Sequence, residues 1–193
     1  TINKASLIAA AGPLVAGVDY ALIRNPCAHG GFTYMPTHTF GQTPGTAVSY
    51  LVNQGWLDGA TRTRRLLRVN AITGTGAAAV LACPSGADFI EVSGYNFNKT
   101  LAPQRGCALG IDPLDSRLMN AVWRNGRVWT THSVGAGSGI TDSAPPSLPE
   151  IAWYQINPAL AGLFPGGSPV QQGKVSGGTS AYYDPSIAVN ADD

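Results

Sequence analysis

The sequence predicts an all-β chain, and three observations support this fold class. Glycine (24) and proline (14) together account for 38 of the 193 residues, which favours many turns. Charged residues make up only 12% of the chain, about half the usual share of roughly 25%, and long amphipathic helices or coiled coils need many more. Apolar runs of about four to eight residues alternate with turn residues, which is the pattern of short strands.

The first group of expected strands lies within residues 30–83. Residues 1–22, which precede it, predict a short N-terminal helix or connector, ended by Gly12-Pro13. Turns rich in Gly, Pro and Asn separate four apolar runs, which we expect to form one antiparallel meander: 33–40, 47–52, 64–71 and 77–82. One more strand is expected at 89–92, within the polar segment 84–116.

The second group of expected strands lies within residues 117–176. Its first two runs are joined by Asn125-Gly126, a strong signal for a type I′ hairpin, because both turn residues must take a positive φ. The four runs are 118–124, 127–134, 151–156 and 170–175. A further strand is expected at 186–190, within residues 184–193.

The two groups show a faint internal repeat. Residues 37–41 (THTFG) match 131–135 (THSVG) at an offset of 94. Residues 66–71 (LLRVNA) and 153–158 (WYQINP) share a similar pattern of apolar and polar residues. Four-stranded units in tandem are typical of propeller blades. We therefore expect residues 1–193 to form a single, partial β-propeller-like domain, with about two four-stranded antiparallel blades and the start of another. A β-sandwich with chance similarity is the alternative.

Several motifs resemble a known group of proteins. Residues 115–134, 152–157, 171–173 and 183–190 are similar to stretches of uncharacterised bacterial exported proteins predicted to be β-propellers, and residues 32–71 resemble the preceding blade of that group. The resemblance implies a propeller fold and an extracellular or periplasmic location, and it implies no reaction. In the similar sequences further strands follow the segment that resembles 186–190. We therefore expect this chain to be a piece of a larger propeller, or to be completed by other chains.

The charge balance argues against two classes of partner. The formal net charge is only +1, whereas nucleic-acid binding needs clustered cations. The one dense cluster, at Arg62, Arg64, Arg65 and Arg68, is interpreted as a solvated strand face. The longest apolar stretch, residues 7–18, is shorter than the roughly 20 residues of a membrane span. The sequence therefore predicts neither a nucleic-acid binder nor a membrane-spanning segment.

Four residues are weak candidates for catalysis: Asp112, Asp115, His132 and Glu150. Carboxylate pairs and histidines are the usual acids and bases of hydrolases. Asp112 and Asp115 could instead bind calcium or form turns. His132 could be a hydrogen-bonded core residue, or it could share a metal or ligand in a central channel with His38. No metal-binding motif has suitable spacing, so no cofactor is predicted, with calcium as the one option.

Aromatic residues and cysteines give the remaining candidates. Trp56, Tyr182 and Tyr183 could form a flat platform for a sugar or a protein partner. Cys83 and Cys107 are the preferred disulfide pair, while buried free cysteines are the alternative.

These features favour an exported binding or structural module without assigned catalysis. Its contacts would come from blade-edge loops, and its partners would be other protein chains, copies of itself or a glycan. The competing hypothesis is a propeller-type hydrolase that acts on a glycan or an ester, with an acidic and histidine site at the channel mouth.

Overall fold

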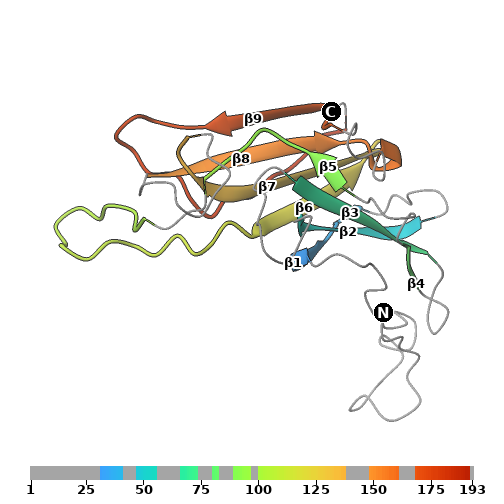
Figure 1. Cartoon of the computed structure of the whole chain (residues 1–193), viewed down its shortest axis with the longest axis horizontal. Coiled ribbons are helices and arrows are strands. Elements are labelled where there is room, and N and C mark those ends of the chain that lie inside the picture. Colours follow the sequence, from blue (N-terminus) through green and yellow to red (C-terminus); the bar gives the residue numbers. More distant parts are fainter. Residues whose placement is uncertain are drawn as a thin grey trace, which may run out of the picture.

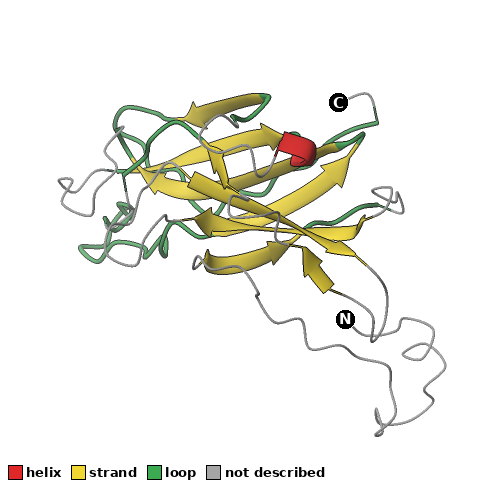
Figure 2. Ribbon diagram, turned by 45° about the vertical axis from the view of Figure 1, so that its right-hand side comes forward, coloured by secondary structure: helices red, strands yellow, loops and turns green. Residues whose placement is uncertain are grey.

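A computed structural model of the chain describes residues 31–40, 47–55, 66–73, 80–82, 89–96, 100–137, 148–160 and 168–191. Within these ranges the protein consists of nine β-strands and one short 3-10 helix (Figures 1 and 2). The all-β prediction is therefore confirmed. The strands form two antiparallel sheets, and the main path of each is a meander of sequential strands. The helix or connector expected at residues 1–22 lies outside the described residues.

The first sheet contains five strands: β1 (Gly31–Pro36), β2 (Ala47–Gly55), β3 (Leu66–Thr73), β4 (Val80–Ala82) and β5 (Phe89–Glu91). Its main order is β1-β2-β3-β4, and β5 also pairs with β3. β4 lies opposite residues 71–73 of β3, and β5 lies opposite residues 66–68. Two short strands therefore share one edge of β3.

The second sheet contains four strands in the order β6-β7-β8-β9. These are β6 (Leu118–Arg124), β7 (Arg127–Gly135), β8 (Pro149–Ile156) and β9 (Gln171–Val175), with the 3-10 helix η2 (Pro158–Leu160) after β8. The β6–β7 turn has φ values of 45° at Asn125 and 76° at Gly126. Both values are positive, as a type I′ turn requires, so the hairpin prediction is confirmed.

The two sheets pack against each other around one main core (Figure 2). Both sheets supply buried apolar side chains, among them Val52, Leu67, Ile90, Leu118 and Ile156. A parallel bridge joins the sheets where the chain leaves β1. There the His38 N–H donates to the Ala121 carbonyl, and the Trp123 N–H donates to the His38 carbonyl, both at 2.9 Å.

Two sequence-based expectations differ from the structure. Residues 186–190 are extended but belong to no β-ladder within the described part of the chain, because their segment crosses the face of the second sheet. Arg68, expected on a solvated strand face, is fully buried, and its guanidinium group lies 5.2 Å from the centroid of the Phe89 ring. This cation–π contact replaces part of the hydration that the charge loses.

No helix among the described residues has the length and apolar character needed to cross a membrane.

Candidate functional site

The two aspartates of the loop before β6 form turns. The Asp112 Oδ1 atom accepts the Leu114 N–H at 2.9 Å, and the Asp115 Oδ1 atom accepts the Arg117 N–H at the same distance. Such contacts to the backbone two residues on are typical of Asx turns. The Asp115 carboxylate also binds the Arg117 guanidinium group at 2.6 and 2.8 Å, which lowers the pKa of Asp115. Both carboxylate oxygens of Asp115 thus accept hydrogen bonds from Arg117, and calcium binding at this aspartate stays a prediction.

His132 lies on β7 in the core and is fully buried. Its Nδ1 atom is 2.7 Å from the Ser116 carbonyl oxygen, and its Nε2 atom is 3.0 Å from the Tyr154 hydroxyl oxygen. A carbonyl oxygen can only accept, so Nδ1 carries the proton and the bare Nε2 accepts the Tyr154 O–H. Burial lowers the pKa of His132 to about 4, so the ring is neutral at pH 7.

The His132 ring belongs to a wider polar network within the core. The Gln54 Nε2 atom on β2 donates to the Tyr95 hydroxyl at 2.9 Å and also to the Ser116 carbonyl. The Tyr95 ring meets the His132 ring edge-on, with centroids 4.8 Å apart. The network therefore ties the first sheet to β7 and β8. Because both ring nitrogens are occupied, His132 is a hydrogen-bonded core residue, as one of the two sequence interpretations expected.

His38 lies in a different environment from His132. Its side chain is exposed, and its ring packs edge-on against Phe40 with centroids 4.0 Å apart. The two histidines therefore do not converge on a shared metal or ligand. Among the described residues, no group of three or more His, Cys, Asp or Glu side chains is placed to hold a metal ion.

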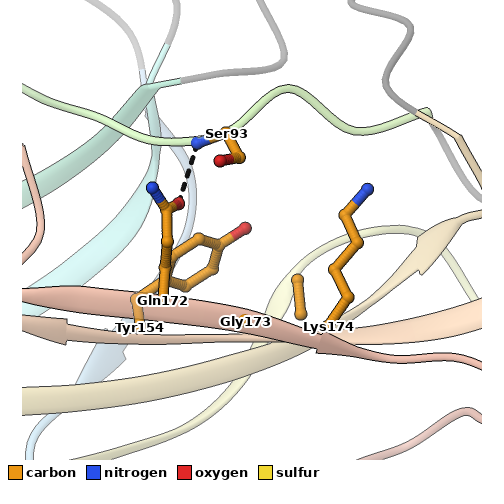
Figure 3. A pocket seen from close by; sticks show the side chains of 6 residues that line it. Ser93, Tyr154, Gln172, Gly173 and Lys174 are labelled. Atoms are coloured by element: carbon orange, nitrogen blue, oxygen red, sulfur yellow. Dashed lines mark hydrogen bonds between the residues drawn. The ribbon is translucent and has the colours of Figure 1, made fainter.

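A cavity of about 240 Å³ lies between the segment after β5 and the strands β8 and β9 (Figure 3). Its lining residues are Ser93, Ala152, Tyr154, Gln172, Gly173 and Lys174. The Ser93 N–H donates to the Gln172 Oε1 atom at 2.8 Å, which ties this segment to β9. The Tyr154 hydroxyl points between Ser93 and Lys174 in Figure 3. The cavity thus gathers polar groups from three separate parts of the chain.

Lys174 supplies the positive charge of this cavity. Its Nζ atom donates to the Gly137 carbonyl at 2.6 Å and to the Gly94 carbonyl at 3.4 Å. Desolvation of the ammonium group lowers the pKa of Lys174, while the Glu150 carboxylate opposes this shift. Of the four catalytic candidates, the structure thus brings Glu150 near the cavity and places His132 directly behind Tyr154.

A second feature lies on the opposite face of the second sheet. The rings of Trp129 on β7 and Trp153 on β8 stack with centroids 6.4 Å apart and planes inclined by 20°. Gly173 on β9 allows Trp153 to lie flat, because a Cβ at this position would lie 2.7 Å from the indole Nε1 atom. A groove of about 440 Å³ runs between the two indoles and residues 187–190.

The C-terminal segment is bound to this aromatic face. Its backbone is fixed at Asp184, whose N–H donates to the Ser133 hydroxyl at 2.9 Å, and at Val189, whose carbonyl accepts from Arg124 at 3.3 Å. Within the segment, Pro185, Ile187 and Val189 are half-buried, whereas Ser186, Ala188 and Asn190 are exposed. One side of the extended segment therefore covers the tryptophans and the other faces solvent.

The sequence-predicted aromatic platform stays a prediction, because only Tyr182 and Tyr183 of its three residues lie within the described part of the chain. Tyr182 and Tyr183 are half-buried, and the Tyr182 ring packs against Gly177, where a Cβ would collide with it. Trp56 lies outside the described residues. The Cys107 side chain is exposed. Its predicted disulfide partner, Cys83, also lies outside them, so that pairing stays a prediction.

The cavity residues Ser93, Tyr154 and Lys174 were not singled out as a site by the sequence. One signal was available: Lys174 is one of only three lysines in the chain, and it lies two positions from Gln172 on the same face of a strand. Comparison with known proteins gives no match to a family model, to a curated protein or to a solved structure.

Proposed function

We propose that this chain is a binding and assembly module of β-propeller type, exported to an extracellular or periplasmic location, which associates with a second copy of itself. The residues that carry this association are the extended segment 185–190 and the tryptophan pair beneath it.

The arrangement of the two sheets supports the propeller hypothesis. The second sheet is a meander in which the strands follow one another in sequence order, as in propeller blades. The first sheet follows the same order from β1 to β4 and departs from it at β5, which pairs with β3. The sheets pack on one another, and the parallel bridge at His38 and Val122 places the chain after β1 beside β6, the first strand of the second sheet. Neighbouring blades that surround a common axis would bring their first strands together in this way.

The single observation that carries the assembly proposal is the segment at residues 185–190. It is extended, its inner side faces Trp129 and Trp153 across the groove, and it belongs to no ladder within the described residues. Natural proteins protect exposed strand edges with charged side chains, proline or bulges. This segment has Pro185 at its start but no charged residue from Ser186 to Asn190. Beyond the proline it therefore lacks the side chains that would prevent another strand from pairing with it. The proposed partner is a strand that pairs with it laterally by β-augmentation.

A second copy of the same chain fits this edge. Two identical uncharged segments can pair antiparallel about a two-fold axis, which closes the assembly as a dimer. The chain carries 12 basic and 11 acidic residues, so long-range charge repulsion does not oppose association.

Binding accounts for the candidate residues better than hydrolysis does. The carboxylates of Asp112 and Asp115 are used in turns, and both nitrogens of His132 are used in the core. A retaining or inverting glycosidase needs two available carboxyl groups facing the substrate. Glu150 alone does not provide such a pair.

The test is light scattering of the purified chain over a range of concentrations. We expect a mass above that of the 20.0 kDa monomer, rising with concentration. The informative variant is Ala188→Asp, because this side chain faces solvent and a charge there leaves the monomer intact. In an antiparallel pair it would place like charges close together, which is destabilising.

Thr179→Asp is the matched control, since it adds the same charge at an exposed turn away from the segment. We expect it to assemble like the unmodified chain, whereas Ala188→Asp remains a monomer. A monomer of the unmodified chain at every concentration would overturn the proposal, as would normal assembly of Ala188→Asp.

A further inference from the structure

The cavity beside Lys174 is independent of the proposed assembly, because it lies on the other face of the second sheet. In the register of β8 and β9, Lys174 is opposite Ala152, whereas Gly173 is opposite Trp153. Successive side chains of a strand point to opposite faces. The tryptophan face and the cavity can therefore be altered separately.

The cavity is rich in hydrogen-bond donors. The Lys174 ammonium group has three N–H bonds, and two carbonyls, of Gly94 and Gly137, accept from it, which leaves one. The Gln172 Oε1 atom is taken by the Ser93 N–H, and the Gln172 amide nitrogen lies on the side away from Lys174 (Figure 3). The Ser93 hydroxyl adds another donor at the same wall (Figure 3).

Tyr154 gives the cavity an acceptor. Its hydroxyl is 3.0 Å from the His132 Nε2 atom, and the Ser116 carbonyl fixes the tautomer in which Nε2 has no proton. The Tyr154 proton is thus donated inward to His132, and lone pairs of its oxygen are left to accept a hydrogen bond. This direction is held by the core and does not depend on a ligand.

We propose that this cavity binds a small hydroxylated carboxylate, of the chemical class of the sugar acids. The carboxylate would accept from Lys174 and the Ser93 hydroxyl, and a ligand hydroxyl would donate to Tyr154. The volume of about 240 Å³ is below the roughly 300–1,000 Å³ of pockets for drug-sized ligands, which suits a single sugar unit. The uncharged surface of Ala152 and Gly173 would lie against the ring.

The charge on Lys174 gives the proposal its specificity. Hydrogen bonds in which one partner is ionised are roughly twice as strong as neutral ones. Glu150 is the described acidic neighbour of Lys174, and its interaction with the ammonium favours the charged form. A neutral sugar would keep the hydroxyl contacts and lose the ion pair, so the cavity should distinguish an acid from its neutral counterpart.

The test is calorimetric titration of the purified chain with D-glucuronate, and with D-glucose as the neutral counterpart. We expect saturable millimolar binding of glucuronate and at least tenfold weaker binding of glucose. Lys174→Met retains the aliphatic stem and removes the charge, and it should weaken glucuronate binding by at least tenfold. Arg105→Gln removes one positive charge from an exposed loop and should leave binding unchanged.

Thermal melts of both variants establish that they are folded before they are titrated. Equal affinity for glucuronate and glucose would overturn the proposal, and so would full retention of binding by Lys174→Met. Absence of any glucuronate binding through the millimolar range would also overturn it. None of these results depends on whether the chain dimerises, because Ala188→Asp can be titrated in the same way.

Discussion

Acidification should weaken this fold through a single buried side chain, His132. Its pKa is about 4 in the folded chain, and the ordinary value of an exposed histidine is about 6.5. Below pH 6.5 the unfolded chain takes up a proton at this position while the folded chain does not. The stabilisation is therefore fully present above pH 6.5 and is lost as the pH falls toward 4.

The size of the effect follows from the two pKa values. Each unit of difference corresponds to about 1.4 kcal/mol. Between about pH 7.5 and about pH 4.5, the free energy of unfolding should fall by about 2.5 kcal/mol because of His132 alone. This is a large part of the roughly 5–15 kcal/mol that stabilises a typical domain. Exposed carboxyl groups titrate mainly below this range, with ordinary pKa values of about 4.

Urea denaturation followed by tryptophan fluorescence measures this dependence directly. His132→Gln removes the titrating ring, so its stability at neutral pH should be lower but should change little down to about pH 4.5. His38→Gln is the control, because His38 is exposed, and this variant should keep the full slope of the unmodified chain. A flat profile for the unmodified chain would refute the reasoning, as would an unchanged slope in His132→Gln.

Two further predictions concern glycines. Gly173→Ala places a Cβ 2.7 Å from the Trp153 indole nitrogen. We expect the free energy of unfolding to fall by about 1–3 kcal/mol, which is typical of overpacking, and the tryptophan emission spectrum to shift. An unchanged thermal melt and an unchanged spectrum would contradict this prediction. Gly126 has a φ of +76° with open space around it, so Gly126→Ala should cost about 1 kcal/mol through backbone strain alone. Gly126→Asn should cost less in the same urea titration, because Asn tolerates this conformation, and the reverse ranking would count against the turn assignment.

The strands could be predicted because their signals are local. Turn residues delimit each apolar run, and Asn125-Gly126 alone specifies a hairpin with two positive φ values. The sequence did not predict that β4 and β5 pair with the same edge of β3. This pairing depends on β5 coming back to β3, and the residues between β4 and β5 carry no pairing signal. The segment 186–190 has a strand-like alternation, yet it packs on a sheet face instead of joining a ladder.

The candidate site was harder to predict than the fold. Residue type favoured the aspartates and His132, since these are common catalytic groups. The sequence left open whether His132 lies in the core or in a central channel, and the Ser116 carbonyl and the Tyr154 hydroxyl satisfy the ring inside the core. The cavity near Lys174 exists only because the β8–β9 register and the segment after β5 meet there. No local pattern specifies that meeting.

The side chains of β7 are buried on both faces of the second sheet, so other parts of the chain must pack against each face. A strand with one solvated face alternates between buried and exposed residues, yet every residue from Thr130 to Gly135 is buried. His132 is covered by the first sheet, and Ser133, on the opposite face, is covered where Asp184 binds its hydroxyl. The segment that follows Asp184 is thus held on this face of the sheet by hydrogen bonds at Asp184 and Val189, and residues 186–190 belong to no β-ladder within the described part of the chain. A segment that is already fixed in an extended conformation loses little conformational entropy when a second strand pairs with it, and this supports the proposed association at this position.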